Sequence, residues 1–507
     1  MSQPLQSINL VAPAFKGVNT EDSPIAQDPS FADIADNAII DKRGRIASRK
    51  GLSLLTVDKT ELGDDYVHRV HYFYDDLGNS AVFSAGNLKI LQGTSDLTDV
   101  TPNAYSIVSN NWKMVNFNDE AYFFQRGHDP LVYSHDKGLR SFTEENGVAT
   151  DEKLKCNEVL PAYGRLWVAD NKDSRQTVYW SDLLMGTTFT GGSSGSIDIS
   201  KAWPDGFDEI VAIAAHNDML VIFGAHSILV YTGASSPANM ILSDTIAGLG
   251  CIDRNTVQHI GTDVLFMSES GLRSFGRTKT EKSLPITDLS LNVKTELIET
   301  ISNHNGPLDT VYSPEHSFYL VVFPEESLVF CFDLKGVLEN NSYRATRWPT
   351  VSHKSFERSR DGILYIGTQE GLNTYSGYLD NTASYRFRYY SPALTFGDPS
   401  KLKMLKKIRP TIVGAGGSTV YMKWAYDFSS MYKNVTFTIE NTETHYYNDQ
   451  DSLFGEATYS SGVVTTRNAV NGAGSGSVVT IGLEADITGS ALSLQEINVL
   501  ALMGKTV

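Results

Sequence analysis

Short apolar runs, each introduced by a polar turn, recur along the chain from about residue 67 to residue 378. The turns hold Asn, Asp, Gly or Pro and include residues 118–119, 217–218, 261–263, 314–316 and 360–362. The apolar runs are residues 121–124, 219–223, 264–267, 318–323 and 363–366, with weaker copies at 81–83 and 165–168. A second polar turn and a third apolar segment follow most runs, as at 228–231. The repeated unit is therefore an antiparallel hairpin with one further strand.

Successive apolar runs lie roughly 40 to 55 residues apart, which is a period typical of propeller blades. A continuous apolar run indicates a strand that is buried on both faces, and a lone three-stranded unit cannot bury both of its faces. The units must therefore stack on one another. We predict an all-β chain in which residues 51–380 form a β-propeller of about six to eight blades.

The pattern changes near residue 380. Alternating strands follow at 420–424, 435–439 and 478–481, separated by Gly, Ser and Asn turns, which predicts an appended antiparallel β-sandwich over residues 381–507. Residues 1–50 are predicted to form an extended N-terminal arm and a first strand, because residues 1–34 are polar and weakly periodic. Helical periodicity is convincing only over residues 289–301.

Composition and charge exclude several classes of protein. The chain of 507 residues has 42 Lys and Arg against 59 Asp and Glu, a formal charge of -17, so a sequence-specific DNA reader is not expected. Three cysteines without a CxxC spacing indicate neither a disulfide framework nor a cysteine-based metal site. No apolar stretch approaches the roughly 18 residues of a membrane helix, and the N-terminus lacks the features of a signal peptide.

Motifs that could carry chemistry have simpler explanations. The GxSxG at residues 191–195 precedes an alternating segment and not a helix, so we interpret it as a loop and not as a nucleophile elbow. His68 and His71 would point to opposite faces of a strand, which prevents them from sharing a metal. Residues 414–417 join two strands and predict a hairpin turn. We therefore predict no catalytic residue, no metal site and no cofactor.

One basic run stands out in this acidic chain, and it consists of Lys401, Lys403, Lys406, Lys407 and Arg409. The simpler interpretation is a solvated face of the first strand of the second domain. The alternative is a docking patch for an acidic neighbouring subunit or an adaptor. Charge reversal at Lys403 and Lys406 would distinguish these alternatives, because it weakens assembly only in the second case.

Residues 12–24 and 35–51 resemble the opening of the tail nozzle proteins of short-tailed phages, a family also called tail tubular protein B or the tail hub. Further similar stretches are residues 248–251, 266–272 and 424–428. The resemblance implies a virion structural protein that is made in the cytoplasm of a host bacterium and is not an enzyme. It also implies a homo-hexameric ring that docks a tail adaptor ring and tail fibres or spikes and lets double-stranded DNA pass. No small-molecule substrate and no membrane insertion by this chain are expected.

Two other hypotheses remain open. A glycan-binding or glycan-cleaving β-propeller would gather carboxylates and arginines from several blades, which a sequence alone does not reveal. A generic propeller scaffold with protein partners is the other. Saturable sugar binding would favour the first of these, and a ring with a central channel would favour the tail nozzle.

Overall fold

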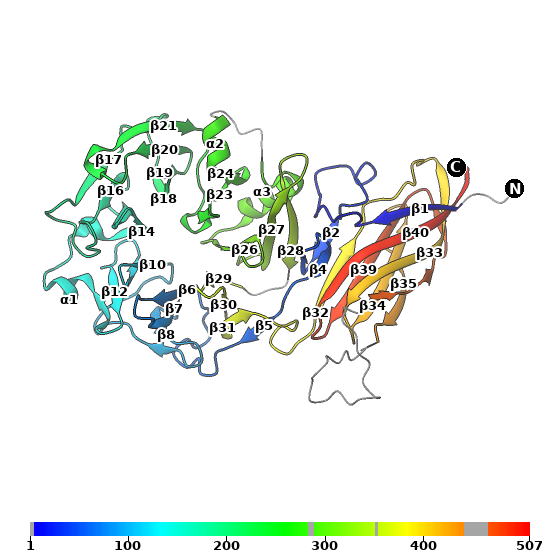
Figure 1. The fold of residues 1–507 in the computed structure, drawn as a ribbon, viewed down its shortest axis with the longest axis horizontal. Coiled ribbons are helices and arrows are strands. Elements are labelled where there is room, and N and C mark those ends of the chain that lie inside the picture. Colours follow the sequence, from blue (N-terminus) through cyan, green and yellow to red (C-terminus); the bar gives the residue numbers. More distant parts are fainter. Residues whose placement is uncertain (1–4, 282–287, 350–352, 441–464, 507) are drawn as a thin grey trace.

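A computed structural model describes residues 5–281, 288–349, 353–440 and 465–506 of the chain. It consists mainly of β-strands, arranged as a propeller on one side and a two-sheet domain on the other (Figure 1). The predicted all-β fold, with a propeller and an appended sandwich, is confirmed.

Seven antiparallel units follow one another around the propeller. Six are separate sheets, and the unit β25–β28 continues into the second domain. The first four units contain β6 (Arg69–Tyr74), β7 (Ser80–Gly86), β8 (Lys89–Gln92) and β9 (Thr98–Asp99); β10 (Lys113–Phe117), β11 (Glu120–Phe124), β12 (Leu131–Ser134) and β13 (Gly138–Ser141); β14 (Cys156–Ala162), β15 (Arg165–Asn171), β16 (Thr177–Trp180) and β17 (Gly195–Asp198); β18 (Ile210–His216), β19 (Met219–Gly224), β20 (Ser227–Thr232) and β21 (Ile241–Ala247). The other three contain β22 (Gln258–His259), β23 (Val264–Ser268) and β24 (Gly271–Ser274); β25 (Asp309–Ser313), β26 (Phe318–Phe323), β27 (Leu328–Val337) and β28 (Tyr343–Pro349); β29 (Ser355–Arg358), β30 (Leu364–Thr368), β31 (Gly371–Tyr375) and β5 (Leu52–Leu54).

The predicted apolar runs all fall at the second strand of a blade. Every residue of β19 and of β26 is buried, because apolar clusters fill the space between adjacent blades. The turn at Asn118 and Asp119 has φ of 49° and 62°, a left-handed conformation that suits the two-residue hairpin between β10 and β11. Turn chemistry and burial on both faces therefore account together for the repeat.

The N-terminal part of the chain closes the propeller. Strand β5 pairs antiparallel with β31, with Leu52 opposite Tyr375 and Leu54 opposite Asn373. The last blade is thus built from two parts of the sequence that lie about 320 positions apart. Such pairing removes a free edge and holds the ring of blades together.

Two sheets form the second domain. One sheet contains β3 (Ala38–Ile40), β4 (Ile46–Ser48), β40 (Leu492–Thr506), β33 (Lys401–Gly414) and β36 (Thr465–Arg467), with β1 (Leu5–Leu10) on β40 and both β37 (Val470–Asn471) and β38 (Ser475–Gly476) on β33. The other contains β2 (Ile34–Asp36), β32 (Tyr385–Tyr390), β39 (Val479–Ile487), β34 (Thr419–Tyr426) and β35 (Lys433–Thr438). Residues 1–50 were predicted to form an extended N-terminal arm and a first strand. In the structure their described part contributes four strands to this domain, because Leu10, Phe15 and Val18 bury their apolar side chains in its core.

A single sheet of nine strands connects the two domains. Strand β2 lies between β28 of the propeller and β32 of the sandwich, with Asp36 opposite Arg347 on one side and Arg388 on the other. Backbone hydrogen bonds therefore run without interruption from one domain into the other. This continuity makes the junction stiffer than a covalent linker alone.

Arg49 holds this junction from within. Its guanidinium donates two hydrogen bonds to the Asp380 carboxylate, at 2.8 and 2.6 Å, and its Nε donates to the Asn37 side chain at 2.9 Å. The guanidinium lies 4.2 Å from the centre of the Tyr385 ring, and only 1% of the side chain is exposed. One side chain thus ties together the N-terminal segment, the end of the propeller and β32.

Helices are short and few in the described ranges. They are α1 (Phe142–Asn146), α2 (Phe275–Glu281) and α3 (Lys294–Asn303), with single turns η1 (Glu152–Leu154), η2 (Pro237–Asn239), η3 (Arg254–Thr256) and η4 (Leu291–Val293). The predicted helix at 289–301 corresponds to η4 and α3, where Val293 and Leu297 are buried. In these ranges no helix combines the length and apolar character needed to cross a bilayer.

Replacement of Arg49 by Met is expected to lower the free energy of unfolding by about 2 to 3 kcal/mol, because it leaves Asp380 and the Asn37 carbonyl without their donor. Urea unfolding followed by circular dichroism measures the change. Arg43, which is exposed in the same N-terminal segment, provides the control, and Arg43→Met should change stability by less than about 0.5 kcal/mol. Equal effects of the two replacements would contradict the role given to Arg49.

His316 predicts a dependence of stability on pH. Burial against Phe318 and Tyr375 lowers the pKa of His316 to about 4, and nearby lysines contribute further. Since the unfolded state binds this proton more strongly, stability falls as the pH drops from about 6.5 to about 4. We expect the wild type to lose about 2 kcal/mol more than His316→Phe over this range. Parallel pH profiles of the two proteins in urea unfolding would contradict the prediction.

Candidate functional site

Charged side chains meet at the axis of the propeller. Arg69 of β6 forms an ion pair with Asp309 of β25 at 2.6 Å and also donates to the Leu308 carbonyl at 3.1 Å. The second oxygen of Asp309 accepts from the backbone N–H of Phe356 in β29 at 2.8 Å. Three blades are therefore linked through one buried ion pair.

A second set of contacts continues around the axis. Lys113 of β10 lies 3.6 Å from Glu158 of β14 and donates to the carbonyl of Arg254 in η3 at 3.2 Å. Arg254 in turn donates to the Asn111 carbonyl at 2.7 Å. The carboxylate and both cations face one another where the innermost strands converge.

Burial determines the protonation of these groups. It raises the pKa of Asp309 to about 6, although Arg69 and two backbone N–H groups act in the opposite direction. Burial also raises the pKa of Glu158, against Lys113 and Arg254, and lowers the pKa of Arg254 to about 10. Each group therefore depends on its neighbours to remain charged inside the ring.

The cavities around this axis are small. One of about 160 Å³ is lined by Arg69, Lys113 and Glu357, and another of about 160 Å³ by Arg126, Arg175 and Arg254. Pockets for drug-sized ligands are usually about 300 to 1,000 Å³. Both of these cavities are therefore smaller than a usual pocket for a drug-sized ligand.

The basic run divides into buried and exposed members. Lys403 is fully buried, and its ammonium donates to the carbonyls of Ser477, at 2.7 Å, and of Asp398. Lys401 forms an ion pair with Asp398 at 2.8 Å. Lys403 was predicted to lie on a solvated face or in a docking patch, and both interpretations are wrong for this residue because it is buried and its ammonium donates hydrogen bonds to backbone carbonyls inside the domain.

Lys406, Lys407 and Arg409 remain on the outside of the sheet that contains β33. Lys406 occupies a bulge between β33 and β40, so it is exposed together with Lys407, while Arg409 is partly exposed. A bulge of this kind is not visible in the sequence pattern, because period-two alternation would have placed Lys406 and Lys407 on opposite faces. The structure thus brings three of the five predicted residues to one outer face.

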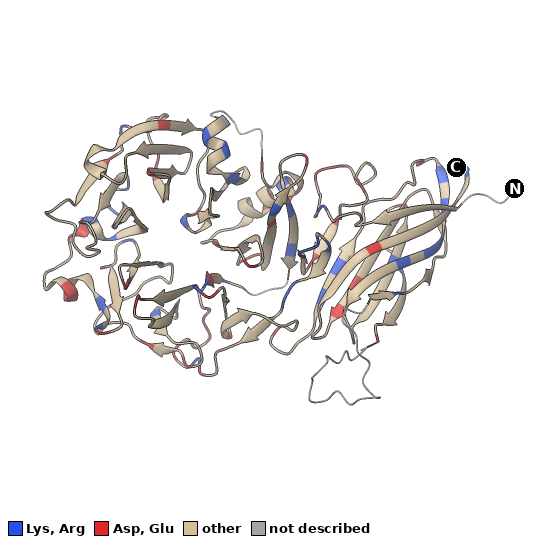
Figure 2. Cartoon of the chain, in the orientation of Figure 1, with Lys and Arg blue, Asp and Glu red and all other residues tan. Residues whose placement is uncertain are grey.

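Charge is distributed unequally between the domains (Figure 2). Residues 51–384 contain 25 Lys and Arg and 43 Asp and Glu, whereas residues 1–50 and 385–507 together contain 17 and 16. Residues 51–384 therefore carry a net formal charge of -18, and the other two segments together carry +1. The negative charge of the chain belongs to the propeller, and the sandwich is close to neutral.

The structure places the other sequence motifs in loops or at separate contacts. Residues 414–417 connect β33 to β34, which lie in different sheets, so the predicted hairpin turn is wrong. Ser193 of the GxSxG donates to Asp182 at 2.6 Å in the loop between β16 and β17, so the motif is a loop between strands, as predicted. His68 lies before β6 and contacts Asp65 at 3.0 Å, whereas His71 contacts Asn116 at 2.8 Å. These histidines have separate partners and do not form a pair.

Sequence reasoning missed one group with metal-ligating side chains. His304, Glu325 and Glu326 bring ligand atoms within 4.8 Å of one another. In the sequence, the two glutamates lie in a polar turn between two apolar segments. His304 lies about 20 positions before them, just after the predicted helix. Their juxtaposition depends on the packing of α3 against β26 and β27, which no local pattern indicates.

Comparisons with known proteins find only solved structures of distant similarity. No family model and no curated protein match the chain. The WD40 domain of Neurospora crassa Pan2 is similar over 65% of this chain and 94% of that domain, at 9% identity and a TM-score of 0.36. PorZ, a surface component of the type-IX secretion system of Porphyromonas gingivalis, matches over 76% of this chain and 46% of its own, at 11% identity and a TM-score of 0.37. The extracellular domain of BT4673 from B. thetaiotaomicron matches over 68% of this chain and 46% of its own, at 12% identity and a TM-score of 0.40. This chain therefore spans less than half of the last two proteins.

Replacement of Arg69 by Met is expected to lower the free energy of unfolding by about 3 to 5 kcal/mol, because it leaves Asp309 buried without its cation. The double replacement Arg69→Met with Asp309→Asn should recover part of this loss, since Asn removes the charge and keeps an acceptor for the Phe356 N–H. Urea unfolding of the three proteins measures the effect. A double variant no more stable than Arg69→Met would contradict the proposed pairing.

Proposed function

We propose that this chain is a subunit of the hexameric tail nozzle of a short-tailed phage, a virion ring through which genome DNA leaves the capsid. The observation that carries the proposal is the rigid junction between propeller and sandwich. The stretches that resemble the nozzle family, residues 12–24 and 35–51, lie in this junction. The resemblance therefore concerns the part of the chain that determines how the two domains are joined.

Individual residues in these stretches have packing roles that explain their identity. Gly17 has a φ of 93°, and a β-carbon at this position would lie 2.9 Å from the Ala345 nitrogen of β28. Only glycine allows this approach. Asn37 accepts from Arg49 and donates to the Arg386 carbonyl at 2.8 Å. These residues serve the joint between the domains and contain no chemistry of their own.

A rigid two-domain subunit suits a closed ring. Closure requires that each subunit present two surfaces at a fixed angle, and a flexible joint would produce a mixture of arcs and filaments. The uninterrupted nine-stranded sheet fixes this angle. The separation of charge supports the same arrangement, because a near-neutral sandwich around the lumen would neither bind nor strongly repel passing DNA.

The outer face of the sheet that contains β33 is the surface we assign to contact between copies. Its register places Leu5, Leu502 and Met404 in one row and Ser7, Leu500 and Lys407 in the next. Leu5 is 59% exposed, and it adjoins the exposed cations. An apolar row beside Lys406, Lys407 and Arg409 would bind the acidic propeller of a neighbouring copy.

The small axial cavities support a structural role over the alternative of a glycan-binding or glycan-cleaving propeller. Catalytic or sugar-binding carboxylates would need access to the substrate, whereas Asp309 and Glu158 are engaged in buried contacts. The acidic outer surface of the propeller remains available for the tail adaptor ring and for fibres or spikes. The proposed chain is thus a structural protein without bond-forming chemistry.

Single-particle electron microscopy of the purified full chain tests the proposal, both alone at high concentration and with the tail adaptor of the same virus. We expect six-fold rings with a central channel. The double charge reversal Lys406→Glu and Lys407→Glu should reduce the fraction of chains in rings at least tenfold, because it replaces attraction by repulsion at the contact.

The matched control is Lys172→Glu with Lys201→Glu, which reverses two exposed lysines on the propeller and should leave the rings intact. Monomers under both conditions would refute the nozzle proposal. Saturable binding in a glycan panel that Glu357→Gln abolishes would support the alternative function. Rings that tolerate the reversal at Lys406 and Lys407 would refute only the assigned contact.

A further inference from the structure

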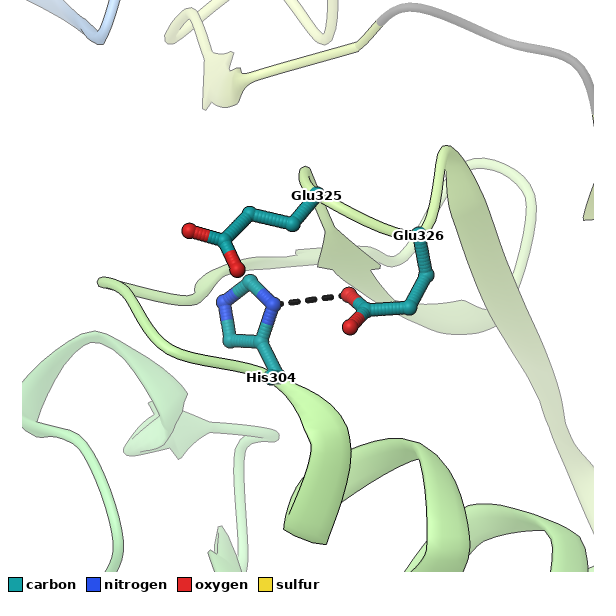
Figure 3. Close-up of side chains that lie close together, drawn as sticks. All are labelled: His304, Glu325 and Glu326. Atoms are coloured by element: carbon teal, nitrogen blue, oxygen red, sulfur yellow. Dashed lines mark hydrogen bonds and ion pairs between the residues drawn. The ribbon is translucent and has the colours of Figure 1, made fainter.

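Next to the propeller axis, an imidazole and a carboxylate face the same small cavity. His304 follows α3, and Glu325 and Glu326 form the turn between β26 and β27 (Figure 3). The cavity has a volume of about 140 Å³ and is lined by His304, Glu325, Gly306 and the axial residue Arg69. Nothing in the proposed ring contact uses these groups.

His304 is held in one orientation by Glu326. Its Nδ1 lies 2.7 Å from the Glu326 carboxylate, and its ring packs edge-on against Phe323. Only 4% of the side chain is exposed, yet the buried Nε2 has no hydrogen-bond partner. A carboxylate that accepts from Nδ1 leaves the lone pair of Nε2 free, which is the arrangement found at metal-binding histidines.

Gly306 leaves room for an ion at this nitrogen. A β-carbon at position 306 would lie 3.6 Å from Nε2 of His304 and 3.4 Å from Oε1 of Glu325. The two atoms therefore border the same small space above the glycine. A cation here would also lie at the carboxyl end of α3, where the helix dipole is negative.

Without an ion, the two carboxylates of the cluster are only partly compensated by the nearby cations. Lys354 lines the cavity, donates to the Pro324 carbonyl at 3.1 Å and faces the Tyr66 ring. Arg69 is paired with Asp309. Glu325 and Glu326 carry two negative charges, and Lys354 carries one positive charge. The excess negative charge of this cluster favours a divalent cation.

We propose that His304 Nε2 and the Glu325 carboxylate bind a divalent transition-metal ion of the zinc class, with water completing the coordination. Imidazole with a carboxylate suits zinc, and Glu326 acts as the positioning residue for the imidazole. The ion would pin the end of α3 to the turn between β26 and β27 beside the axis. The proposal does not depend on the nozzle function.

Zinc titration of the chelator-treated full chain by calorimetry, together with the visible spectrum of the cobalt-substituted protein, tests the site. We expect one ion per chain in the wild type, at least 100-fold weaker binding in His304→Ala and about 10-fold weaker binding in Glu326→Gln. Gly306→Ala should abolish binding while the fold persists, because its methyl group makes only ordinary contacts. His226→Ala, which removes an exposed propeller histidine, is the control and should bind normally.

Two results would overturn the proposal. One is a wild-type protein that takes up no stoichiometric zinc near neutral pH, because His304 and Glu325 would then not form a metal site. The other is equal zinc affinity in the wild type, His304→Ala and Gly306→Ala, where the ion would be bound elsewhere. Circular dichroism of each variant separates loss of the site from loss of the fold.

Discussion

The buried guanidinium of Arg49 is the contact on which the architecture depends. It lies where the N-terminal segment, the end of the propeller and β32 of the sandwich meet, and it contacts a carboxylate, an amide and an aromatic ring at once. Around it, β2 joins a propeller blade to the sandwich through continuous backbone hydrogen bonds. Because backbone hydrogen bonds and one buried charged side chain hold the same junction, the fold itself sets the angle between the domains.

The propeller itself is stabilised in two different ways. Apolar second strands pack blade against blade, as in β19 and β26, and this packing supplies most of the hydrophobic burial. At the axis the innermost strands converge on ion pairs such as Arg69 with Asp309. Ion pairs of this kind contribute little net stability, but removal of one partner is severe, so they favour one arrangement of the blades over others.

Sequence patterns predicted the propeller well because its signal is local. Each blade carries its own turn and its own apolar run, as at 217–223, and these features are visible in the sequence without knowing which strands pair. The structure of the N-terminal segment could not be predicted in this way, since β1, β2 and β4 pair with strands that lie hundreds of residues away. The burial of Lys403 could not be predicted for the same reason, because the Ser477 carbonyl that it contacts lies in a distant part of the sequence. The contact of His304 with Glu326 was missed because Glu326 lies in another turn.

The sandwich is a discontinuous domain, and this has a consequence for biosynthesis. Its core pairs Leu10 with Ile497, so the sheet cannot form until nearly the whole chain has left the ribosome. Six of the seven blades are contiguous in sequence and can fold one after another as they emerge, whereas the last one also needs β5. During translation the apolar residues of the N-terminal segment therefore remain exposed until β40 has been synthesised. Strand β40 thus completes this sheet and covers residues that were translated nearly 490 positions earlier.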